Sequence, residues 1–391
     1  MILNKKVKKI CIVVNSRANY ARIKSVLIGI NKNKYLKLIL VVGASATLFR
    51  FGEVDKVIKR DGFNIDDRIF SVVEGNDLIG MSKTIGLSII ELSNILRKKK
   101  PDLVVAIADR YENLSVSIAA SYMNIPVAHI QGGETTGSID EKVRHAITKM
   151  SDIHFVSTKR SRQFIIKMGE LKSRVFLTGC PSIDLAKIKN YKLKNNFFNK
   201  IGSGAPVFSS EKYILVIQHP VTTEFEKAKT QIEETIEAIK LFHYKTNYKV
   251  IWLWPNIDAG SDTFSKKIRI FKETLPNYVR FIKNFTPEDY IRVLKNSKCI
   301  VGNSSSGIRE ASFLGVPTVN IGTRQSDRER GPNVIDVIHN RKKISNSIIK
   351  QIGKKFKKSF IYGSGNAGEK IAKIILKSNF RINKKLNYLI K

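Results

Sequence analysis

Titratable side chains are concentrated in residues 131–152, QGGETTGSIDEKVRHAITKMSD, which follow the short apolar run IPVAHI. The candidates for acid and base chemistry in this stretch are Glu134, Asp140, Glu141, Arg144 and His145. Carboxylates at a strand end can exchange protons with a substrate, and a neighbouring guanidinium or imidazole can orient them. The two glycines at 132 and 133 also fit an ordinary surface turn. The stretch therefore indicates either a proton-transfer site or a plain turn.

Two further polar groups of the first half follow apolar runs. Arg17 comes after KICIVV, where a guanidinium can grip a phosphate through two hydrogen bonds. Taken alone, Arg17 fits an exposed surface arginine equally well. Asp109 and Arg110 come directly after LVVAIA, and as an isolated pair they fit a simple ion pair or a helix cap. Their meaning depends on what the second half contributes.

The second half places polar and small residues after its own apolar runs. His219 follows YILVIQ, and histidine is the side chain most easily poised for proton transfer near neutral pH. Ser304 and Ser305 follow CIVGN and open a helix, where free amides and hydroxyls can cradle a phosphate, although a plain helix N-cap is the alternative. The remaining candidates are Asn256, Glu310 and Arg324. Together they predict a phosphate-binding wall facing the carboxylates.

Short apolar runs alternate with amphipathic segments along almost the whole chain, which is typical of an α/β protein with parallel sheets. The strands expected in the first half are 9–14, 37–42, 103–108, 125–130, 153–157 and 174–179. Those expected in the second half are 213–218, 250–254, 279–284, 299–303 and 318–322. We therefore expect two Rossmann-like, doubly wound domains that face a central cleft lined by the carboxyl ends of their strands.

A chain of 391 residues exceeds the size at which one hydrophobic core keeps growing, so two domains are expected. We expect an N-terminal Rossmann-like domain at 1–185 that carries the acid and base residues. The segment 186–210, rich in Asn, Gly and Ser, is the expected linker. A nucleotide-binding Rossmann-like domain at 211–370 and a basic helix or tail at 371–391 complete the predicted organisation.

The formal net charge of +36, from 69 basic and 33 acidic residues, is of the kind that nucleic-acid-binding proteins carry. Its distribution favours a solvated, lysine-rich surface, because residues 341–391 alone hold 15 basic residues and one acid, without a recognisable nucleic-acid-binding motif. Residues 131–152 carry four acids against three bases, so they do not belong to a basic groove. A polyanion-binding protein stays as the alternative from a different class.

The sequence disfavours several other classes. Cys11, Cys180 and Cys299 are widely spaced and fit reduced packing residues of a cytoplasmic protein. No apolar run reaches the roughly eighteen residues of a membrane span, and ICIVV is too short for a signal-peptide core. No G-x-G-x-x-G follows a strand, which argues against hydride transfer. We expect a soluble cytoplasmic enzyme with neither a nucleic-acid nor a membrane partner.

Six segments resemble, in order and spacing, the hydrolysing UDP-N-acetylglucosamine 2-epimerases of sialic-acid biosynthesis. They are ADRYE, GGETTGSIDEKVRHAITK, QHPVTTE, WPNIDAGSD, GNSSSGIRE and GTRQSDRERGPNV, within a likeness that runs from about residue 8 to residue 378. The resemblance implies two domains of the glycosyltransferase-B type. It also implies a nucleotide-sugar substrate, UDP-N-acetylglucosamine, converted to N-acetylmannosamine and free UDP without a metal or other cofactor, and a homodimer or homotetramer.

The reaction implied by the resemblance removes the C2 proton as UDP leaves C1, and water then adds to the glucal with the opposite C2 configuration. The residues implied in proton transfer and hydration are Asp109, Glu134, Asp140 and His219, with the base unassigned among the carboxylates. The residues implied in holding uridine, ribose or diphosphate are Arg17, Arg110, Asn256, Ser304, Ser305, Glu310 and Arg324. Arg144 and His145 are expected either to orient Glu134 and Asp140 at the substrate or to pack their helix against the sheet.

The chain departs from the family pattern at five positions. Ala108 stands where a glycine usually precedes the Asp-Arg pair, and Asp327 also replaces a usual glycine. Asn19 stands where an acid is common, Ala21 where the animal enzyme has serine, and Gln131 where Glu or His is frequent. These departures leave the substrate open. The alternatives are a UDP- or GDP-linked 2,4-diacetamido-2,4,6-trideoxy sugar of the legionaminic-acid pathway, a non-hydrolysing epimerase, or a glycosyltransferase of the same fold.

Overall fold

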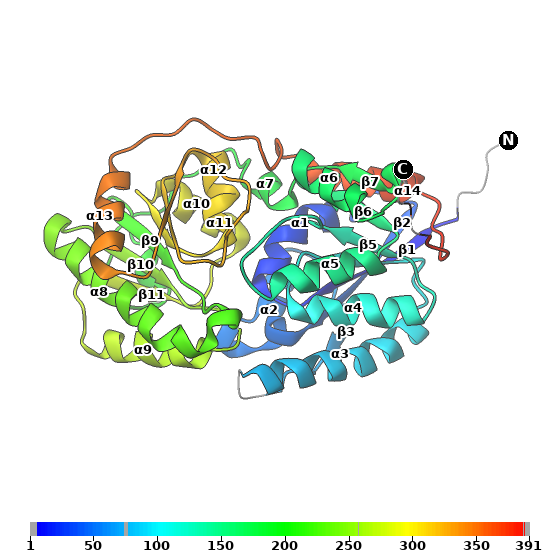
Figure 1. Ribbon diagram of the computed structural model, residues 1–391, viewed down its shortest axis with the longest axis horizontal. Coiled ribbons are helices and arrows are strands. Elements are labelled where there is room, and N and C mark those ends of the chain that lie inside the picture. The colour runs from blue at the N-terminus through cyan, green and yellow to red at the C-terminus, as the bar shows by residue number, and fades with distance from the viewer. Residues whose placement is uncertain (1–5, 74–76, 257, 386, 388–391) are drawn as a thin grey trace.

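The protein consists of two lobes that lie side by side along its long axis (Figure 1), as seen in a computed structural model that describes residues 6–73, 77–256, 258–385 and 387. Each lobe contains its own seven-stranded sheet with a hydrophobic core on both faces. The end of the predicted tail, residues 386 and 388–391, lies outside the described residues. The expected α/β architecture with two facing sheets is confirmed.

The first sheet is wholly parallel, with the order β3-β2-β1-β4-β5-β6-β7. Its strands are β1 (Lys8–Val14), β2 (Leu36–Gly43), β3 (Asp67–Ile69), β4 (Leu103–Ile107), β5 (Val127–Ile130), β6 (Ile153–Val156) and β7 (Val175–Leu177). Ile10 and Ile12 point into one core and Cys11 and Val13 into the other, as the continuous apolar run predicts. β3 was not predicted, because its three residues, DRI, include two charges.

The second sheet has the order β14-β13-β12-β9-β10-β11-β8 and is parallel except for its edge strand β8. Its strands are β8 (Ser203–Gly204), β9 (Tyr213–Ile217), β10 (Lys249–Leu253), β11 (Val279–Ile282), β12 (Ile300–Gly302), β13 (Thr318–Ile321) and β14 (Val334–Val337). The short β8 lies inside the expected linker and pairs antiparallel with β11. Sequence analysis missed β8 because Gly and Ser disfavour strands.

Fourteen α-helices connect the strands of the described chain and cover the sheets. They are α1 (Arg17–Asn31), α2 (Val54–Arg60), α3 (Leu78–Lys99), α4 (Tyr111–Tyr122), α5 (Asp140–Met150), α6 (Lys159–Lys167), α7 (Pro181–Leu185), α8 (Ala228–Thr246), α9 (Ser261–Glu273), α10 (Pro287–Asn296), α11 (Ser305–Ile308), α12 (Glu310–Leu314), α13 (Arg341–Ile352) and α14 (Ala367–Lys377). None of these described helices is both long and apolar enough to cross a membrane.

The last helix, α14, returns from the second lobe and packs against α1 of the first (Figure 1). Glycines allow the close approach: a Cβ atom on Gly368 would lie 2.4 Å from the backbone carbon of Ser25, and one on Gly29 would lie 3.0 Å from the carbonyl oxygen of Gly368. The ammonium group of Lys8 donates to the carbonyls of Leu376, in the last turn of the helix, and Ser378, just after it. The chain therefore crosses between the lobes twice, once before the strands of the second sheet and once after them in the sequence.

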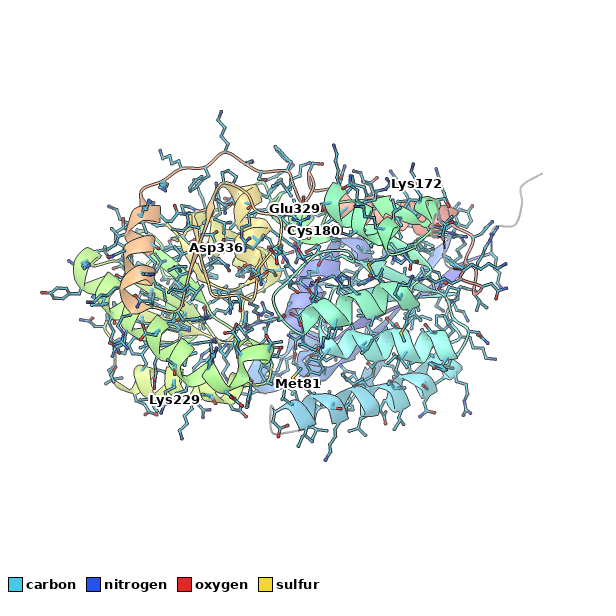
Figure 2. All side chains as sticks on the ribbon, in the orientation of Figure 1. Met81, Lys172, Cys180, Lys229, Glu329 and Asp336 are labelled. Atoms are coloured by element: carbon cyan, nitrogen blue, oxygen red, sulfur yellow. The ribbon has the colours of Figure 1, made fainter. Side chains whose placement is uncertain are left out.

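The strand order of each sheet reverses at one point, between β1 and β4 in the first and between β9 and β12 in the second. Ligands of open α/β sheets bind at the carboxyl ends of the strands that flank such a point. Figure 2 places Cys180 and Glu329 at the boundary between the lobes, and all three cysteines are buried and free, as expected of packing residues. A ligand site is therefore expected among the residues that follow these four strands.

Candidate active site

The first lobe contributes a wall of three carboxylates, of which Asp109 and Glu134 are buried and Asp140 is partly exposed. Asp109 follows β4 by two residues, Glu134 follows β5 in the loop to α5, and Asp140 is the first residue of α5. Arg144, one turn further along α5, is fully buried and donates to the Asp109 carboxylate and, at 2.7 Å, to the Glu134 carbonyl. One guanidinium thus ties together two of the expected acid residues, and its helix carries the third.

The second lobe meets each carboxylate with a guanidinium. All three arginines come from the two loops that follow β12 and β13. The pairs are Asp109 with Arg328 at 3.5 Å, Asp140 with Arg324 at 3.6 Å, and Glu134 with Arg309. Ion pairs from opposite lobes bring the two walls into direct contact. The strand-end residues predicted from sequence do therefore converge between the lobes.

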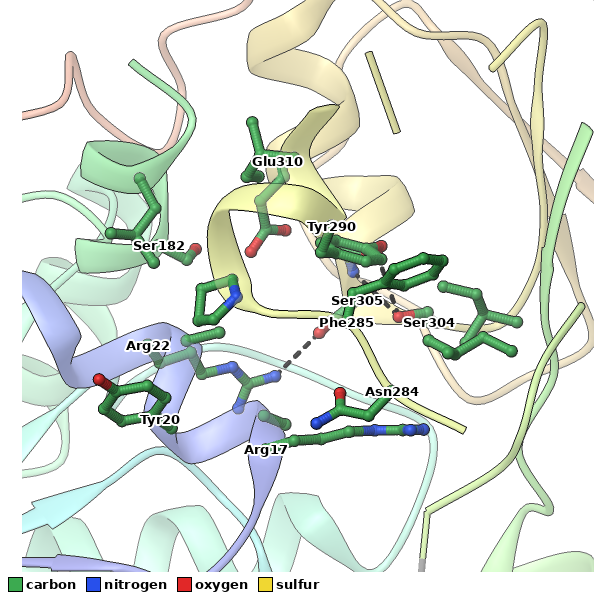
Figure 3. Close-up of a pocket in the computed structure, with 18 of the residues that line it drawn as sticks. Arg17, Tyr20, Arg22, Ser182, Asn284, Phe285, Tyr290, Ser304, Ser305 and Glu310 are labelled. Carbon is green, nitrogen blue, oxygen red and sulfur yellow. Dashed lines mark hydrogen bonds between the residues drawn. The ribbon is translucent and has the colours of Figure 1, made fainter. Parts of the chain in front are cut away.

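Arginines of the first lobe reach across in the other direction. Arg17 donates through Nε to the Asn256 side-chain oxygen at 3.1 Å, and Arg110 pairs with Asp258 at 2.9 Å. Arg22, on α1, donates to the Ser305 hydroxyl at 2.8 Å and lies 3.4 Å from an Asp109 oxygen. Figure 3 shows the Arg22 side chain extending from α1 toward Ser305.

A pocket opens between the lobes, and Figure 3 shows part of its lining. Its lining includes Arg17, Arg22, His219, Phe285, Ser305 and Glu310. The three carboxylates do not line this pocket, whereas Arg22 lines it and also lies 3.4 Å from an oxygen of Asp109. The site therefore has two parts: the pocket, called here the large compartment, and the adjoining cluster of Asp109, Glu134 and Asp140, called the acidic compartment.

The carboxylates differ in their tendency to ionise. Burial alone would raise the pKa of Asp109, but the guanidiniums of Arg144 and Arg22 outweigh it and hold that pKa well below its ordinary value. The pKa of Glu134 is likewise lowered, because Arg309 and Arg328 overcome the effect of burial. Asp140 is the exception, since its desolvation and the nearby negative charge of Asp109 raise its pKa. Of the three, Asp140 is the carboxylate best suited to accept a proton.

His219, after β9, is held as a neutral ring. Burial, followed by the positive charges of Arg324 and Arg17, lowers its pKa far below the ordinary value. The backbone N–H of Asn256 donates to Nδ1 at 3.1 Å, so Nδ1 accepts and the ring proton sits on Nε2. Because His219 lines the pocket, its ring can present an N–H donor there. Asn256, another residue that the sequence analysis expected at a strand end, thereby fixes the tautomer of His219.

The serine turn after β12 acts as a helix N-cap, one of the two roles that the sequence left open. Ser304 caps α11, since its hydroxyl accepts from the Ser306 N–H at 3.4 Å. Ser305 instead takes the hydrogen bond from Arg22. Glu310 begins α12, faces the pocket, and its buried Oε2 has no hydrogen-bond partner among the described residues. A buried carboxylate oxygen without a donor is costly unless a ligand supplies one.

His145 bonds within its own helix. Its Nε2 is 2.7 Å from an oxygen of Glu141, four residues earlier on α5, and its hydrogen bonds among the described residues reach neither Glu134 nor Asp140. The i, i+4 spacing of a helix places these two side chains side by side on one face. Arg144 lies beneath the carboxylates and does not line the pocket, so its contacts orient Asp109 and do not reach a nucleotide there.

Four charged residues of the site were missed from the sequence: Arg22, Asp258, Arg309 and Arg328. Three of them lie inside the segments that carried the resemblance, WPNIDAGSD, GNSSSGIRE and GTRQSDRERGPNV, next to residues that were chosen. Arg22 is five residues after Arg17, which a helix places on a different turn of α1. The feature that could have identified Arg22 in the sequence is a second arginine within the first two turns of a helix that starts at a strand end.

Ala108 and Asp327, the two positions where the family usually has glycine, both have a left-handed backbone, with φ of 59° and 58°. Glycine adopts that conformation freely, whereas a residue with a Cβ atom does so at a cost of about 1–2 kcal/mol. Ala108 directly precedes Asp109, and the Asp327 carbonyl accepts a hydrogen bond from the Thr135 hydroxyl at 2.6 Å. Backbone strain is thus stored on both walls of the site.

Across the described ranges, no three or more His, Cys, Asp or Glu side chains converge as a metal-ligand set would.

Two Rossmann-like sheets, with a pocket and matched charges between their strand ends, define a protein of the glycosyltransferase-B type. The solved structures that it resembles share this architecture. The UDP-GlcNAc 2-epimerase of Neisseria meningitidis bound to UDP-GlcNAc superposes with a TM-score of 0.78 at 19% identity, covering 95% of this chain and 100% of that one. That of Methanocaldococcus jannaschii, in complex with UDP-GlcNAc and UDP, gives 0.76 at 18% identity and the same coverage.

The sequence comparison is more specific than the fold. Residues 29–376 match the family model described as UDP-N-acetylglucosamine 2-epimerase, and the chain belongs to that family. A Legionella pneumophila protein, "UDP-N,N'-diacetylbacillosamine 2-epimerase (hydrolyzing)", is 34% identical over 94% of this chain and 96% of its own. An Escherichia coli protein, "Polysialic acid biosynthesis protein P7", is 33% identical over 84% of this chain and 82% of its own.

Proposed function

We propose that this protein is a hydrolysing nucleotide-sugar 2-epimerase, which converts a UDP-linked 2-acetamido sugar into the free 2-epimer and UDP. The observation that carries the proposal is the divided site. A pocket that contains a carboxylate oxygen without a partner adjoins, across Arg22, three carboxylates of which one has a raised pKa. Such a layout separates the grip on a leaving diphosphate from proton transfer at the sugar.

In the proposed complex the nucleotide fills the large compartment. Glu310 accepts hydrogen bonds from the ribose hydroxyls, which supplies the donors that its unpaired Oε2 lacks. Phe285 offers the aromatic face on which a uracil base stacks. Arg22 and the Ser305 hydroxyl, which now bond to each other, turn to the diphosphate. Arg17, Asn256 and Ser304 also line this pocket, whereas Arg110 and Arg324 lie outside its lining and pair with Asp258 and Asp140.

The proposed chemistry runs in two steps. Asp140 takes the C2 proton while the C1–O bond breaks and its electron pair leaves with UDP, which gives a 1,2-unsaturated sugar. Water then adds: a protonated group on the opposite face gives its proton to C2, the water oxygen bonds to C1 and loses one proton to a carboxylate of the first lobe, and Asp140 releases the proton that it took to the solvent. Asp109 and Glu134, held ionised by arginines, stabilise the positive charge that develops near C1, and the His219 N–H donates to the leaving phosphate.

Two sugars are candidates for the substrate. The resemblance in the sequence favours UDP-N-acetylglucosamine, which yields N-acetylmannosamine in a sialic-acid type of pathway. The names of two relatives favour UDP-N,N'-diacetylbacillosamine instead: the Legionella protein, and a Campylobacter jejuni protein named "GDP/UDP-N,N'-diacetylbacillosamine 2-epimerase (hydrolyzing)" that is 31% identical over 84% of each chain. A Neisseria meningitidis protein named for UDP-N-acetylglucosamine is 28% identical. The 34% identical relative favours the diacetamido sugar, whereas the Escherichia coli protein named for polysialic acid biosynthesis, at 33%, favours the sialic-acid type of pathway.

Product analysis tests the function and the substrate together. The protein is incubated separately with UDP-N-acetylglucosamine, UDP-N,N'-diacetylbacillosamine and the GDP-linked form of the latter, and the products are followed by proton and phosphorus NMR. The proposal predicts free nucleoside diphosphate and free 2-epimer in equal amounts with at least one of them. Retention of the nucleotide on an epimerised sugar would identify a non-hydrolysing epimerase. Turnover only after addition of a sugar acceptor would identify a glycosyltransferase.

A further inference from the structure

The backbone next to Asp109 is held in place by a buried histidine that takes no part in the chemistry proposed above. Ala108 has a left-handed conformation, with φ of 59°. Its N–H donates to the carbonyl of Ile130 at 2.8 Å, and its carbonyl lies 2.8 Å from Nε2 of His129. Both contacts come from the neighbouring strand β5, so β5 holds the peptide that sets the direction of the Asp109 side chain.

The protonation of His129 follows from its partners. The ring is fully buried on β5, and the Ala108 carbonyl can only accept, so Nε2 must carry the proton. Nδ1 is then the acceptor, 3.1 Å from the Thr148 hydroxyl, which donates to it. Burial lowers the pKa of His129 to about 3, which keeps the ring neutral wherever the protein functions near neutral pH.

These bonds close a ring through helix α5. Thr148 is four residues after Arg144, so both side chains lie on the same face of α5. Arg144 binds the Asp109 carboxylate, while Thr148 acts through His129 on the carbonyl that precedes Asp109. One helix therefore fixes both the side chain and the backbone of this residue, and the same helix begins with Asp140.

The loop after β5 is shaped around the histidine. A Cβ atom on Gly132 would lie 2.7 Å from Nδ1 of His129 and 2.9 Å from the Thr148 hydroxyl oxygen. Only glycine therefore leaves room for the hydrogen bond between these two side chains. This gives Gly132 a role in addition to that of a turn residue, which was the plain interpretation of its sequence context.

We propose that His129 is a positioning residue for Asp109: its Nε2–H pins the strained Ala108 carbonyl and thereby aims the carboxylate at the substrate. The proposal rests on the proposed function for its effect on turnover. In this chain the role has particular weight because alanine, unlike glycine, gains by leaving the left-handed conformation once the carbonyl is released.

The test combines substitutions at two positions. His129→Leu removes both ring contacts and is expected to lower kcat at least tenfold while leaving UDP affinity within twofold. His129→Gln can place a side-chain N–H near the position of Nε2, and it should keep kcat within threefold of wild type. Ala108→Gly in the His129→Leu protein should recover at least half of the lost kcat, because glycine holds the conformation without help. Val127→Ala, a cavity in the same strand outside the ring, is the matched control for stability and should leave kcat unchanged.

A second readout does not depend on turnover. Hydrogen exchange at the Ala108 and Asp109 amides should accelerate at least tenfold in His129→Leu, and less in the double variant with Ala108→Gly. If wild type turns over none of the sugars, the proposed function fails, yet this exchange still tests the positioning. Unchanged exchange at these amides would overturn the proposal, as would a loss of kcat that Ala108→Gly leaves fully in place, since a merely structural role predicts that result.

Discussion

The two walls of the cleft use charge in opposite ways. The first lobe presents carboxylates whose oxygens already bond to arginines, and the second presents arginines, hydroxyls and one carboxylate, Glu310, without a partner on one oxygen. Neither wall holds both a proton acceptor with a raised pKa and a pocket for a diphosphate. The difference teaches that the site exists only where the lobes meet, so each wall should fail in its own way when changed.

The first lobe should fail in turnover. Replacing the side chain with the raised pKa, in Asp140→Asn, is expected to lower kcat by about 10³-fold or more while UDP binds within about threefold of wild type, because the nucleotide compartment is untouched. Glu134→Gln should likewise keep UDP affinity and abolish turnover. Steady-state kinetics and calorimetric titration with UDP measure the two effects. The control is Asp152→Asn, which makes the same substitution at a carboxylate that directly precedes β6 and lies outside the cleft.

A wild-type-like rate in Asp140→Asn would remove Asp140 as the base, and one in Glu134→Gln would remove Glu134 as a stabiliser of the charge near C1. Loss of UDP binding in either variant would show that the two compartments are not separate.

The second lobe should fail in binding. Ser305→Ala removes a hydroxyl proposed to turn from Arg22 to the diphosphate, and we expect KM to rise about tenfold with kcat within threefold, which corresponds to about 1.4 kcal/mol. Ser297→Ala, a buried serine of the same lobe at the end of α10, should change neither constant. A loss confined to kcat in Ser305→Ala would contradict the assignment of this hydroxyl to nucleotide binding.

The pH dependence should sharpen the contrast within the first wall. Asp140 must be ionised to accept the C2 proton, and its pKa is raised above the ordinary 3.8, so kcat/KM should fall as the pH drops through that raised value. Asp109 and Glu134, whose pKa values are lowered, stay ionised in this pH range and add no further acid limb to the pH profile. Absence of an acid limb above pH 3.8, or its persistence in the residual activity of Asp140→Asn, would contradict the assignment of the base.

The smallest expected effect compares the strained positions of the two walls. Ala108→Gly should raise the free energy of unfolding by about 0.5–1 kcal/mol, because it removes left-handed strain. Asp327→Gly should raise it by less, since aspartate tolerates this conformation better than alanine. Thermal or denaturant unfolding measures both. A destabilised Ala108→Gly protein would show that no strain is stored there.

Much of the fold could be predicted because the strands are buried on both faces and read as continuous apolar runs. Eleven strands were located in this way, whereas β3, β8 and β14 were missed: each lies at or next to a sheet edge, is short or partly polar, and so lacks that signal. The residues at strand ends were also found. Their partners across the cleft, Arg309 and Arg328, were not, since pairing between distant loops leaves no local pattern.

The two histidines His145 and His129 also show that contacts set by the packing of elements cannot be predicted from the sequence. His145 drew attention because it lies among acids, yet it bonds to Glu141 on its own helix. His129 drew none, because a histidine inside an apolar run looks like a core residue. Its contacts with Ala108 and Thr148 depend on how β4, β5 and α5 pack, which only the folded chain supplies.

The most direct test of the account is the fate of the sugar's C2 hydrogen. The protein is incubated in deuterated water with whichever UDP-linked sugar it hydrolyses, and the free sugar is examined by NMR. We predict one deuterium at C2 of the epimerised product, with UDP released in equal amount, and no such product from Asp140→Asn. Retention of the original hydrogen at C2 during turnover would contradict proton removal by a carboxylate of the first lobe.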